Sequence, residues 1–301
     1  MERVVSPWPH LKDSVSVREI MFAVVIALLP ATAFGVWAFG LNALLMIITS
    51  ICTAVITEYL ALKLMGKKFL MDGSAVVTGL LFTLTLPPTL PLWAAAVGAA
   101  VAISIGKCAF GGLGYNIFNP ALIGRAFLML SWPSLMTSWV MPSTLTTGAT
   151  PLAGATAGYA DLFLGNVAGS IGEISKLALL IGGLFLIAMK YIDWRVPLFY
   201  IGTVGVLTLA LGQDPIFHML AGGLFLGAFF MATDYTTTPI TKKGKVIFAI
   251  GAGSLVVAIR LFGGLPEGVA YSILIMNAFS PLIERVTRPR VYGTGKKVVS
   301  K

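Results

Sequence analysis

Hydroxyl groups form the densest cluster of chemically useful side chains in this chain. The run at 144–152 reads Thr-Leu-Thr-Thr-Gly-Ala-Thr-Pro-Leu. An accessible threonine hydroxyl can be esterified, and Gly148 and Ala149 leave the backbone before Thr150 approachable by a modifying enzyme. Pro151 fixes the chain directly after it. Taken alone, however, this composition is also typical of a low-complexity linker.

Four charged residues lie within or beside apolar stretches. Glu58 interrupts one such stretch, and a carboxylate at membrane depth is a candidate for ion handling, although pairing with a base explains it equally well. Arg125 suits a phosphate, or a pair with Glu58 or a backbone carbonyl. Arg260 lies in another Gly-flanked stretch. Asp234, in a threonine-rich turn, is either a cation entry point or a helix cap or partner surface.

Metal and disulfide chemistry have no recognisable pattern. His10 and His218 are far apart, and Cys52 and Cys108 fall in different segments. They form neither a metal-ligand cluster nor an iron–sulfur or disulfide spacing. We therefore expect no metal site.

The composition indicates a membrane protein. Hydrophobic residues make up 57% of the 301 residues and charged residues only 11%, whereas soluble proteins contain about 25% charged residues. We predict an all-α polytopic membrane protein with about ten transmembrane helices. Short segments with Gly or Pro predict broken or tilted helices around a cavity. The apolar segments are Ile20–Ala38, Leu41–Leu64, Ala75–Leu86, Leu92–Gly106, Pro120–Trp132, Leu177–Met189, Pro197–Leu211, Ile216–Ala232, Val246–Phe262 and Gly268–Ile283.

Basic residues sort to one side of these segments. With the N-terminus inside, every Lys and Arg falls in an inside connection or tail except Arg125, Lys176 and Arg260. Cytoplasmic connections are rich in Lys and Arg, so the net charge of +9 reflects topology and does not indicate nucleic acid. We predict a multi-pass protein of the bacterial cytoplasmic membrane, with both termini cytoplasmic and the Thr150 connection external, or periplasmic.

The two halves of the chain resemble each other. The Phe-Gly-Gly-Leu motif at 110–113 recurs at 262–265, and a Leu-Ile-x-Arg sequence follows in both places. Five segments per half reverse the direction of the second half, which predicts two inverted five-helix repeats. Chance recurrence in a Gly-rich chain is the alternative. The predicted units are 1–132, the external connection 133–175, whose length is typical of a functional loop, and 176–301.

Longer motifs resemble one membrane protein family. They are similar to the D subunit of the Rnf ion-translocating ferredoxin:NAD oxidoreductase complex, which is related to the B subunit of the sodium-translocating NADH:quinone reductase. The resemblance covers nearly the whole chain. It is carried by Ser6-Pro7, Asp72-Gly73-Ser74, the stretch from Gly111 to Ala121, the stretch from Met231 to Asp234, Thr238-Pro239, the stretch from Tyr271 to Asn277, and the stretch from Thr287 to Gly293.

The resemblance implies a cofactor on the hydroxyl run. In this family a Ser/Thr-Gly-Ala-Thr motif carries FMN through a phosphoester to its last threonine. The matching residues are Thr147, Gly148, Ala149 and Thr150, which makes Thr150 the phosphorylated acceptor. The broader pattern of related subunits has Asp where this chain has Thr144.

Further expectations follow from the same resemblance. Arg125 is the candidate contact for the flavin or its phosphate, and riboflavin is a second, non-covalent flavin. Glu58 and Asp234 are candidates for the ion pathway. The chain passes electrons between ferredoxin and NADH modules and is not catalytic alone. Its partners are Rnf subunits A, B, C, E and G, together with a flavin transferase for maturation.

Two alternatives stay open. The residues do not distinguish Na⁺ from H⁺ as the translocated ion. A urea- or ammonium-type solute channel without flavin is the alternative function, because inverted repeats of five short helices also suit that class.

Overall fold

The structure, a computed structural model, describes residues 15–67, 71–142, 146–154, 157–263 and 268–289. Within these ranges the chain is helical, apart from turns and one isolated bridge between Val140 and Thr147, which confirms the all-α prediction. Nine helices coincide with apolar segments: α1 (Val17–Phe39), α2 (Leu41–Leu64), α3 (Ser74–Leu84), α4 (Leu92–Ser104), α5 (Pro120–Ser131), α8 (Lys176–Ala188), α9 (Arg195–Ala210), α12 (Lys242–Phe262) and α13 (Val269–Thr287). Short helices lie in the connections: η1 (Cys108–Phe110), α6 (Pro133–Met136), η2 (Pro151–Ala153) and α7 (Tyr159–Leu164).

The predicted segment Ile216–Ala232 is a broken helix. It is divided into α10 (Pro215–Leu220), α11 (Leu224–Leu226) and the π-helical turn η3 (Gly227–Met231). The break falls at Gly222, whose φ of 67° is a left-handed conformation that favours glycine. The expectation that Gly-interrupted segments form broken helices is confirmed here.

Within the described ranges, five helical spans are long and apolar enough to cross a membrane. About 20 residues are needed for this. The helix α3 has only 11 residues and is therefore roughly 16 Å long. It reaches about half of the thickness of the hydrocarbon core, which is about 30 Å. The five spans are Val17–Phe39, Leu41–Leu64, Leu92–Phe110, Lys242–Phe262 and Val269–Thr287.

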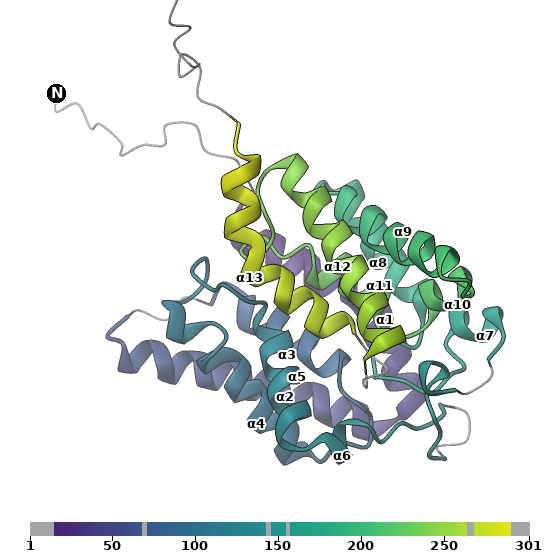
Figure 1. The fold of residues 1–301 in the computed structure, drawn as a ribbon. Coiled ribbons are helices and arrows are strands. Elements are labelled where there is room, and N and C mark those ends of the chain that lie inside the picture. Colours follow the sequence, from purple (N-terminus) through teal and green to yellow (C-terminus); the bar gives the residue numbers. More distant parts are fainter. Residues whose placement is uncertain (1–14, 68–70, 143–145, 155–156, 264–267, 290–301) are drawn as a thin grey trace, which may run out of the picture.

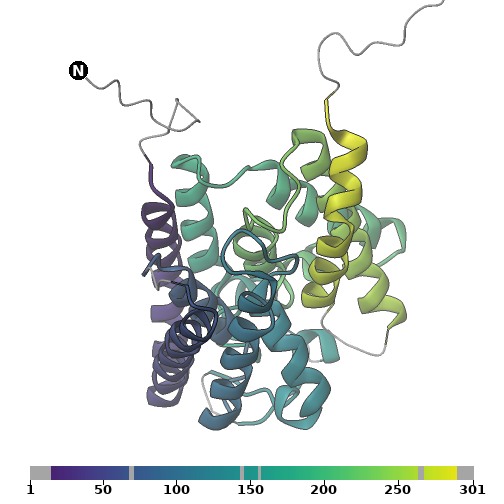
Figure 2. The ribbon, with the colours of Figure 1, turned by 90° about the vertical axis from the view of Figure 1, so that its left-hand side faces the viewer.

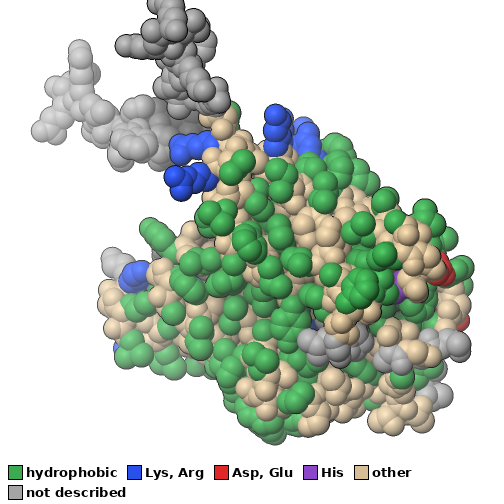
Figure 3. Space-filling view, viewed as in Figure 1, with side chains coloured by type: hydrophobic (Ala, Val, Ile, Leu, Met, Phe, Trp, Pro, Cys, Tyr) green, Lys and Arg blue, Asp and Glu red, His purple; other side chains and the backbone are tan. Residues whose placement is uncertain are grey.

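Large apolar side chains cover the outside of the molecule. Trp37, Leu64, Leu130 and Phe262 are each more than three-quarters exposed, and Figure 3 shows apolar side chains over most of one face. Lys and Arg gather at the upper and left-hand parts of that face, and acidic side chains at its right-hand edge. Soluble proteins rarely expose so much contiguous apolar surface, so this exterior is suited to lipid.

Corresponding helices pack alike in the two halves. In the first half α4 packs between α2 and α5, and in the second half α12 packs between α9 and α13. The halves meet where α1 packs on α8, and Gly182 brings α8 so close to the Ala27 carbonyl that a β-carbon has no space. This matched packing supports a duplicated architecture, while the inverted relation between the halves stays a prediction.

The two described ends of the chain lie at the same end of the helix bundle (Figure 2). The start of α1 and the end of α13 point to the upper end of the molecule, and the short helix α6 lies at the lower end (Figures 1 and 2). This is the arrangement expected for two termini on one side and the long connection on the other. Which side is cytoplasmic stays a prediction.

The long connection is not a simple surface loop. Every residue from 167 to 176 is buried. The N–H groups of Ile171 and Gly172 donate to the carbonyls of Leu86 and Leu84 at the end of α3, at 3.0 and 2.9 Å. Non-helical backbone inside a membrane protein is tolerated where protein encloses it. The last part of this connection is therefore enclosed by the helices, and its location on the external side stays a prediction.

Candidate functional site

Thr150 lies in a narrow pocket at the start of η2. Its side chain is 4% exposed, and its buried Oγ1 atom has no hydrogen-bond partner among the described residues. The pocket has a volume of about 10 Å³, and Val167, Glu173, Lys176 and Gly222 are among the residues that line it. An unpaired buried hydroxyl is costly, so this atom marks a place where a further polar group fits.

The residues of the Thr-Gly-Ala-Thr motif differ in exposure. Thr147 and Ala149 are exposed, Gly148 is half-buried, and Thr150 is buried. Thr147 pairs with Val140, so the motif folds back on the preceding segment and its last residue turns inward. The expectation that Thr150 offers an accessible hydroxyl is therefore wrong for the folded chain.

Two buried charged residues share the pocket with Thr150. The Lys176 Nζ atom donates to the backbone carbonyl of Glu173 at 2.7 Å, and the Glu173 Oε1 atom accepts the Ser170 N–H at 2.9 Å. Lys176 and Glu173 are 1% and 5% exposed. A β-carbon on Gly223 would lie 2.7 Å from the Glu173 carboxylate, so glycine at this position allows the carboxylate to be enclosed.

Arg125 lies in a neighbouring pocket and not in that of Thr150. It projects from α5, is 7% exposed, and lines a small cavity together with Thr85, Glu173 and Gly223. Glu173 therefore lines both pockets, with Thr150 in one and Arg125 in the other. Contact between Arg125 and a flavin stays a prediction.

A second candidate site lies between the two halves. The short helix α3 and the π-helical turn η3, the third elements of their halves, line a cavity of about 80 Å³ together with α1 and the connection before α5. Short or interrupted helices at corresponding positions are typical of ion and substrate sites. The predicted internal cavity is therefore present, and it has room for a few water molecules.

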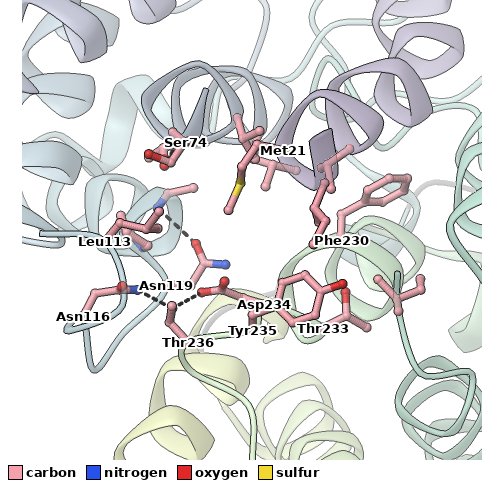
Figure 4. A pocket seen from close by; sticks show the side chains of 18 of the residues that line it. Met21, Ser74, Leu113, Asn116, Asn119, Phe230, Thr233, Asp234, Tyr235 and Thr236 are labelled. Carbon is pink, nitrogen blue, oxygen red and sulfur yellow. Dashed lines mark hydrogen bonds between the residues drawn. The ribbon is translucent and has the colours of Figure 1, made fainter. Parts of the chain in front are cut away.

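Polar side chains from both halves meet on the wall of this inter-half cavity. Asn116 Nδ2 donates to Thr236 Oγ1 at 2.8 Å, and Thr236 Oγ1 donates to Asp234 Oδ2 at 3.0 Å (Figure 4). Burial raises the pKa of Asp234, although hydrogen bonds from Thr236 and Thr237 oppose this shift. Asp234 therefore lies in a polar cluster on the wall of a largely apolar cavity, and its role in an ion pathway stays a prediction.

Glu58 is part of a buried ion pair. Its carboxylate contacts the Lys107 ammonium, and the two side chains are 6% and 2% exposed. Lys107 also donates to Ser74 Oγ, and Ser74 Oγ donates to Asp72. Of the alternatives for Glu58, pairing with a base is confirmed. The base is Lys107, and the alternative partner Arg125 lines a different pocket, with Glu173.

Lys107 lies in the connection between α4 and α5, as predicted, but it is not solvated. Its side chain is buried and lines the inter-half cavity that Asp234 also lines. The ammonium can be buried because the Glu58 carboxylate offsets the cost of desolvation. Lys107 thus contacts the Glu58 carboxylate and lines the same cavity as Asp234.

Three site residues, Lys107, Glu173 and Lys176, were not predicted from the sequence. A signal existed for two of them. Lys176 is one of three basic residues that do not sort to the inside, and Glu173 is the one acidic residue between 162 and 192. Lys107 gave no such signal, because its position after an apolar segment also suits a solvated connection. Among the described residues no three His, Cys, Asp or Glu side chains converge as metal ligands.

Comparison with known proteins identifies the family. The model of the NQR2, RnfD, RnfE family matches residues 4–293. The chain is 50% identical over 317 residues to the D subunit of the proton-translocating ferredoxin:NAD(+) oxidoreductase complex of Clostridium ljungdahlii, and the match covers 96% of each chain. It is also 50% identical over 305 residues to the D subunit of the Na(+)-translocating ferredoxin:NAD(+) oxidoreductase complex of Acetobacterium woodii, and here the match covers 97% of this chain and 96% of the relative. The chain belongs to the NQR2, RnfD, RnfE family.

The match to the NQR2, RnfD, RnfE family spans both candidate sites, because residues 4–293 include Thr150 and the inter-half cavity. The family resemblance inferred from the sequence is therefore confirmed, and the cofactor stays a prediction. The buried Thr150 Oγ1, which has no described partner, offers an oxygen for a phosphoester, and Lys176 lines the same pocket. The pocket volume of about 10 Å³ suits at most one water molecule, so the Thr150 segment has to move to hold a phosphoryl group. Thr144, which departs from the family pattern, lies outside the described residues.

Proposed function

We propose that this chain is the membrane subunit of an ion-translocating ferredoxin:NAD(+) oxidoreductase and carries FMN through a phosphoester on Thr150. Two relatives with 50% identity over nearly their whole length bear that complex in their names. Thr150 Oγ1, buried without a described partner in the pocket of Lys176, carries the cofactor assignment. The chain passes electrons between ferredoxin and NADH modules on its partners, Rnf subunits A, B, C, E and G, and is not catalytic alone.

Attachment of the flavin is a phosphoryl transfer with no change of oxidation state. Thr150 Oγ1 attacks the flavin-side phosphorus of a flavin dinucleotide. The Oγ1–P bond forms, the anhydride P–O bond breaks, a nucleoside monophosphate leaves, and the hydroxyl proton passes to a base of the flavin transferase. Because Thr150 is buried in the folded chain, the segment 146–154 must reach the transferase before it packs against 167–176, or by opening from it.

When bound, FMN supplies electron-transfer chemistry that no side chain of this protein provides. The protein supplies a fixed attachment point. Pro151 restricts the backbone after Thr150 and begins η2, and the buried stretch 167–176 forms a wall behind it. A flavin held this way stays at one position relative to the helices, as electron transfer between modules requires.

A denaturing gel viewed under ultraviolet light tests the cofactor. After co-expression with the flavin transferase, the wild-type chain is expected to give a fluorescent band and Thr150→Ala none. Thr146→Ala is the matched control, because Thr146 is an exposed threonine four residues earlier, and it keeps the band. A colourless wild-type chain would overturn the proposal and favour the urea- or ammonium-type channel.

The inter-half cavity is the proposed ion pathway. Asp234 and Lys107 line it, and Lys107 holds the Glu58 carboxylate. The two relatives that are 50% identical differ in the ion that their names give, one proton and one Na⁺. Activity in vesicles measured against Na⁺ concentration at fixed pH distinguishes the two ions. If Asp234→Asn and Glu58→Gln both leave ion transport unchanged, the pathway does not use these carboxylates.

The predicted riboflavin is assigned to the same inter-half cavity. Amide and carboxyl groups from Asn116, Asn119 and Asp234 can bond a polar ring, and Phe229 and Phe230 supply apolar surface. The present volume of about 80 Å³ suits water molecules, so a flavin ring requires α3 and η3 to move apart. Protein carrying Thr150→Ala, precipitated with acid, is expected to release free flavin. A colourless supernatant from pure protein would remove this assignment.

The predicted topology has its own test. In a chain without Cys52 and Cys108, a cysteine replacing Thr146 is expected to react with a membrane-impermeant maleimide on intact cells. A cysteine replacing Lys243, an exposed residue at the start of α12, is expected to react only after permeabilisation. The reverse pattern would place the Thr150 connection in the cytoplasm, where an exported transferase could not reach it.

A further inference from the structure

A second pocket lies beside the inter-half cavity, where the α8–α9 connection meets the connection between η3 and α12. We call it the side pocket. Its volume is about 130 Å³, and Tyr191, Asp193, Thr238 and Lys245 are among the residues that line it. Asp193 and Lys245 form an ion pair at 3.4 Å and are partly exposed. The side pocket is therefore polar, lies at the surface and has room for several water molecules.

The side pocket and the inter-half cavity share part of their walls. The residues that line both are Ile192, Thr233, Asp234 and Tyr235. Asp234 is the one charged residue among these four, so its carboxylate lies at the boundary between the two spaces. Tyr235 has the largest side chain of the four, and it lies beside Asp234 on the cavity wall (Figure 4). Because Tyr235 is also 52% exposed, a single side chain separates the cavity from the surface at this point.

The Tyr235 ring is attached to one half of the molecule, and the residue after it is attached to the other. The Tyr235 hydroxyl donates to the Tyr191 carbonyl in the α8–α9 connection of the second half. Thr236 Oγ1 accepts from Asn116 Nδ2 of the first half at 2.8 Å. Movement between the halves changes the distance between these two attachments. A single hydrogen bond at an exposed position contributes little net stability, so such a movement can release the ring.

We infer that the side pocket is the entrance through which water and small cations reach the inter-half cavity, and that the Tyr235 ring is the barrier in this entrance. The inference rests on the proposed function of the cavity as the ion pathway, and it adds the route of entry and the residue that closes it. While the hydroxyl is bonded to the Tyr191 carbonyl, the ring covers the boundary beside Asp234. When this bond is broken, the ring moves aside and the two spaces join.

The reaction of a cysteine inside the cavity tests this route. The full chain without Cys52 and Cys108 carries Thr78→Cys, because Thr78 lines the inter-half cavity, does not line the side pocket and is 8% exposed. The probe is a small cationic thiol reagent, a methanethiosulfonate with an ethylammonium group. Its rate of reaction with the purified chain in detergent is measured by mass spectrometry, and the Tm shows whether each variant is folded.

Two substitutions at the barrier and one control are added to this chain. Tyr235→Ala removes the ring, and Tyr235→Phe keeps the ring but removes the hydroxyl that bonds to Tyr191. Tyr115→Ala is the matched control, because Tyr115 is a 71% exposed tyrosine in the first half that lines neither space. Tyr235→Ala is expected to raise the labelling rate several-fold, Tyr235→Phe to raise it less, and Tyr115→Ala to leave it unchanged.

An unchanged rate in Tyr235→Ala, or an equal rise in Tyr115→Ala, would overturn the inference, because the reagent would then reach Thr78→Cys by another route. If Tyr235→Ala does not fold, Tyr235→Phe decides, and a rate equal to that of the chain with Tyr235 would overturn the inference. Labelling requires neither flavin nor electron transfer. Unchanged ion transport in Asp234→Asn and Glu58→Gln would therefore contradict the proposed pathway, whereas the labelling rates test the entrance separately.

Discussion

The Thr150 pocket and the inter-half cavity are each lined by a buried lysine that bonds to a glutamate, but the two pairs differ. Lys107 contacts the Glu58 carboxylate directly, across 49 residues of sequence. Lys176 donates to the backbone carbonyl of Glu173, three residues earlier. The Glu58–Lys107 contact therefore joins two side chains from distant segments, whereas the bond between Lys176 and Glu173 is local and uses the backbone.

The two sites also differ in the origin of their walls. The Thr150 pocket is formed mostly by one stretch of chain, 150–176, with Gly222 added. The inter-half cavity joins elements from both halves, and the Asn116–Thr236 bond crosses 120 residues. Movement of the halves relative to each other would therefore reshape the cavity and leave the Thr150 pocket nearly intact. This suits a fixed flavin beside a changeable ion pathway.

The largest expected stability effect separates the two glutamates. Glu58→Gln leaves Lys107 buried without its counter-charge, and breaking a buried pair in this way costs about 3–5 kcal/mol. Glu173→Gln keeps an acceptor for the Ser170 N–H and also keeps the backbone carbonyl that holds Lys176, so its loss is expected to be smaller than that of Glu58→Gln. Thermal unfolding in detergent measures both. Lys107→Met added to Glu58→Gln restores part of the loss, and equal losses for the two single variants would contradict the distinction between the pairs.

An intermediate effect is expected for Asn119, which joins the halves. Its Oδ1 atom accepts the Ala121 N–H at 3.1 Å as the N-cap of α5, and its Nδ2 atom donates to the Met231 carbonyl at 3.3 Å. Asn119→Ala removes both bonds in a buried place and is expected to cost about 1–3 kcal/mol. Asn42→Ala is the control, since exposed Asn42 bonds to Pro88 within one half. A larger loss in the control would show that Asn119 does not couple the halves.

The pH dependence of stability is expected to have opposite signs for two aspartates. Burial raises the pKa of Asp234 above its ordinary 3.8, so the folded chain binds this proton more tightly than the unfolded chain. Its contribution to stability therefore falls as the pH rises from 3.8 through the raised value. The hydrogen bond from Tyr159 lowers the pKa of exposed Asp214, so its contribution is present above 3.8 and is lost as the pH falls.

The measurement is Tm against pH for the wild-type chain, Asp234→Asn and Asp214→Asn. Asp234→Asn should gain stability relative to the wild type as the pH rises from about 4. Asp214→Asn should lose stability relative to the wild-type chain as the pH rises through the range up to about 3.8, where the Asp214 carboxyl of the wild-type chain ionises. Parallel curves for Asp234→Asn and the wild type would mean that Asp234 is as hydrated in the folded chain as in the unfolded one.

The smallest effect is expected at a surface ion pair. Asp193 contacts Arg195 at 3.2 Å and Lys245 at 3.4 Å, and all three side chains are partly exposed. Exposed pairs contribute about 1 kcal/mol or less and weaken with salt. Asp193→Asn is therefore expected to lower the Tm slightly at low salt and not at high salt. A salt-independent loss as large as that of Glu58→Gln would remove the contrast between buried and exposed pairs.

The helices and the membrane class could be predicted from the amino-acid order, because both depend on local pattern. The segment Leu41–Leu64 was predicted with the boundaries of α2, since a long apolar run has few other stable forms in lipid. Gly222 broke the eighth segment through its own backbone preference. The Thr-Gly-Ala-Thr motif was likewise found as a contiguous pattern, through its resemblance to a family.

The meeting of charged groups, in contrast, depends on how the helices pack. Nothing in the residues around Glu58 indicates that Lys107 is its partner, and nothing around Asp234 indicates Asn116. The burial of Thr150 also depends on the later stretch 167–176, which bonds to the end of α3. These contacts join distant parts of the chain, and their energy comes from desolvation, which exists only after the helices have packed. Local patterns fix where helices form, but the electrostatics of a site depend on what encloses it.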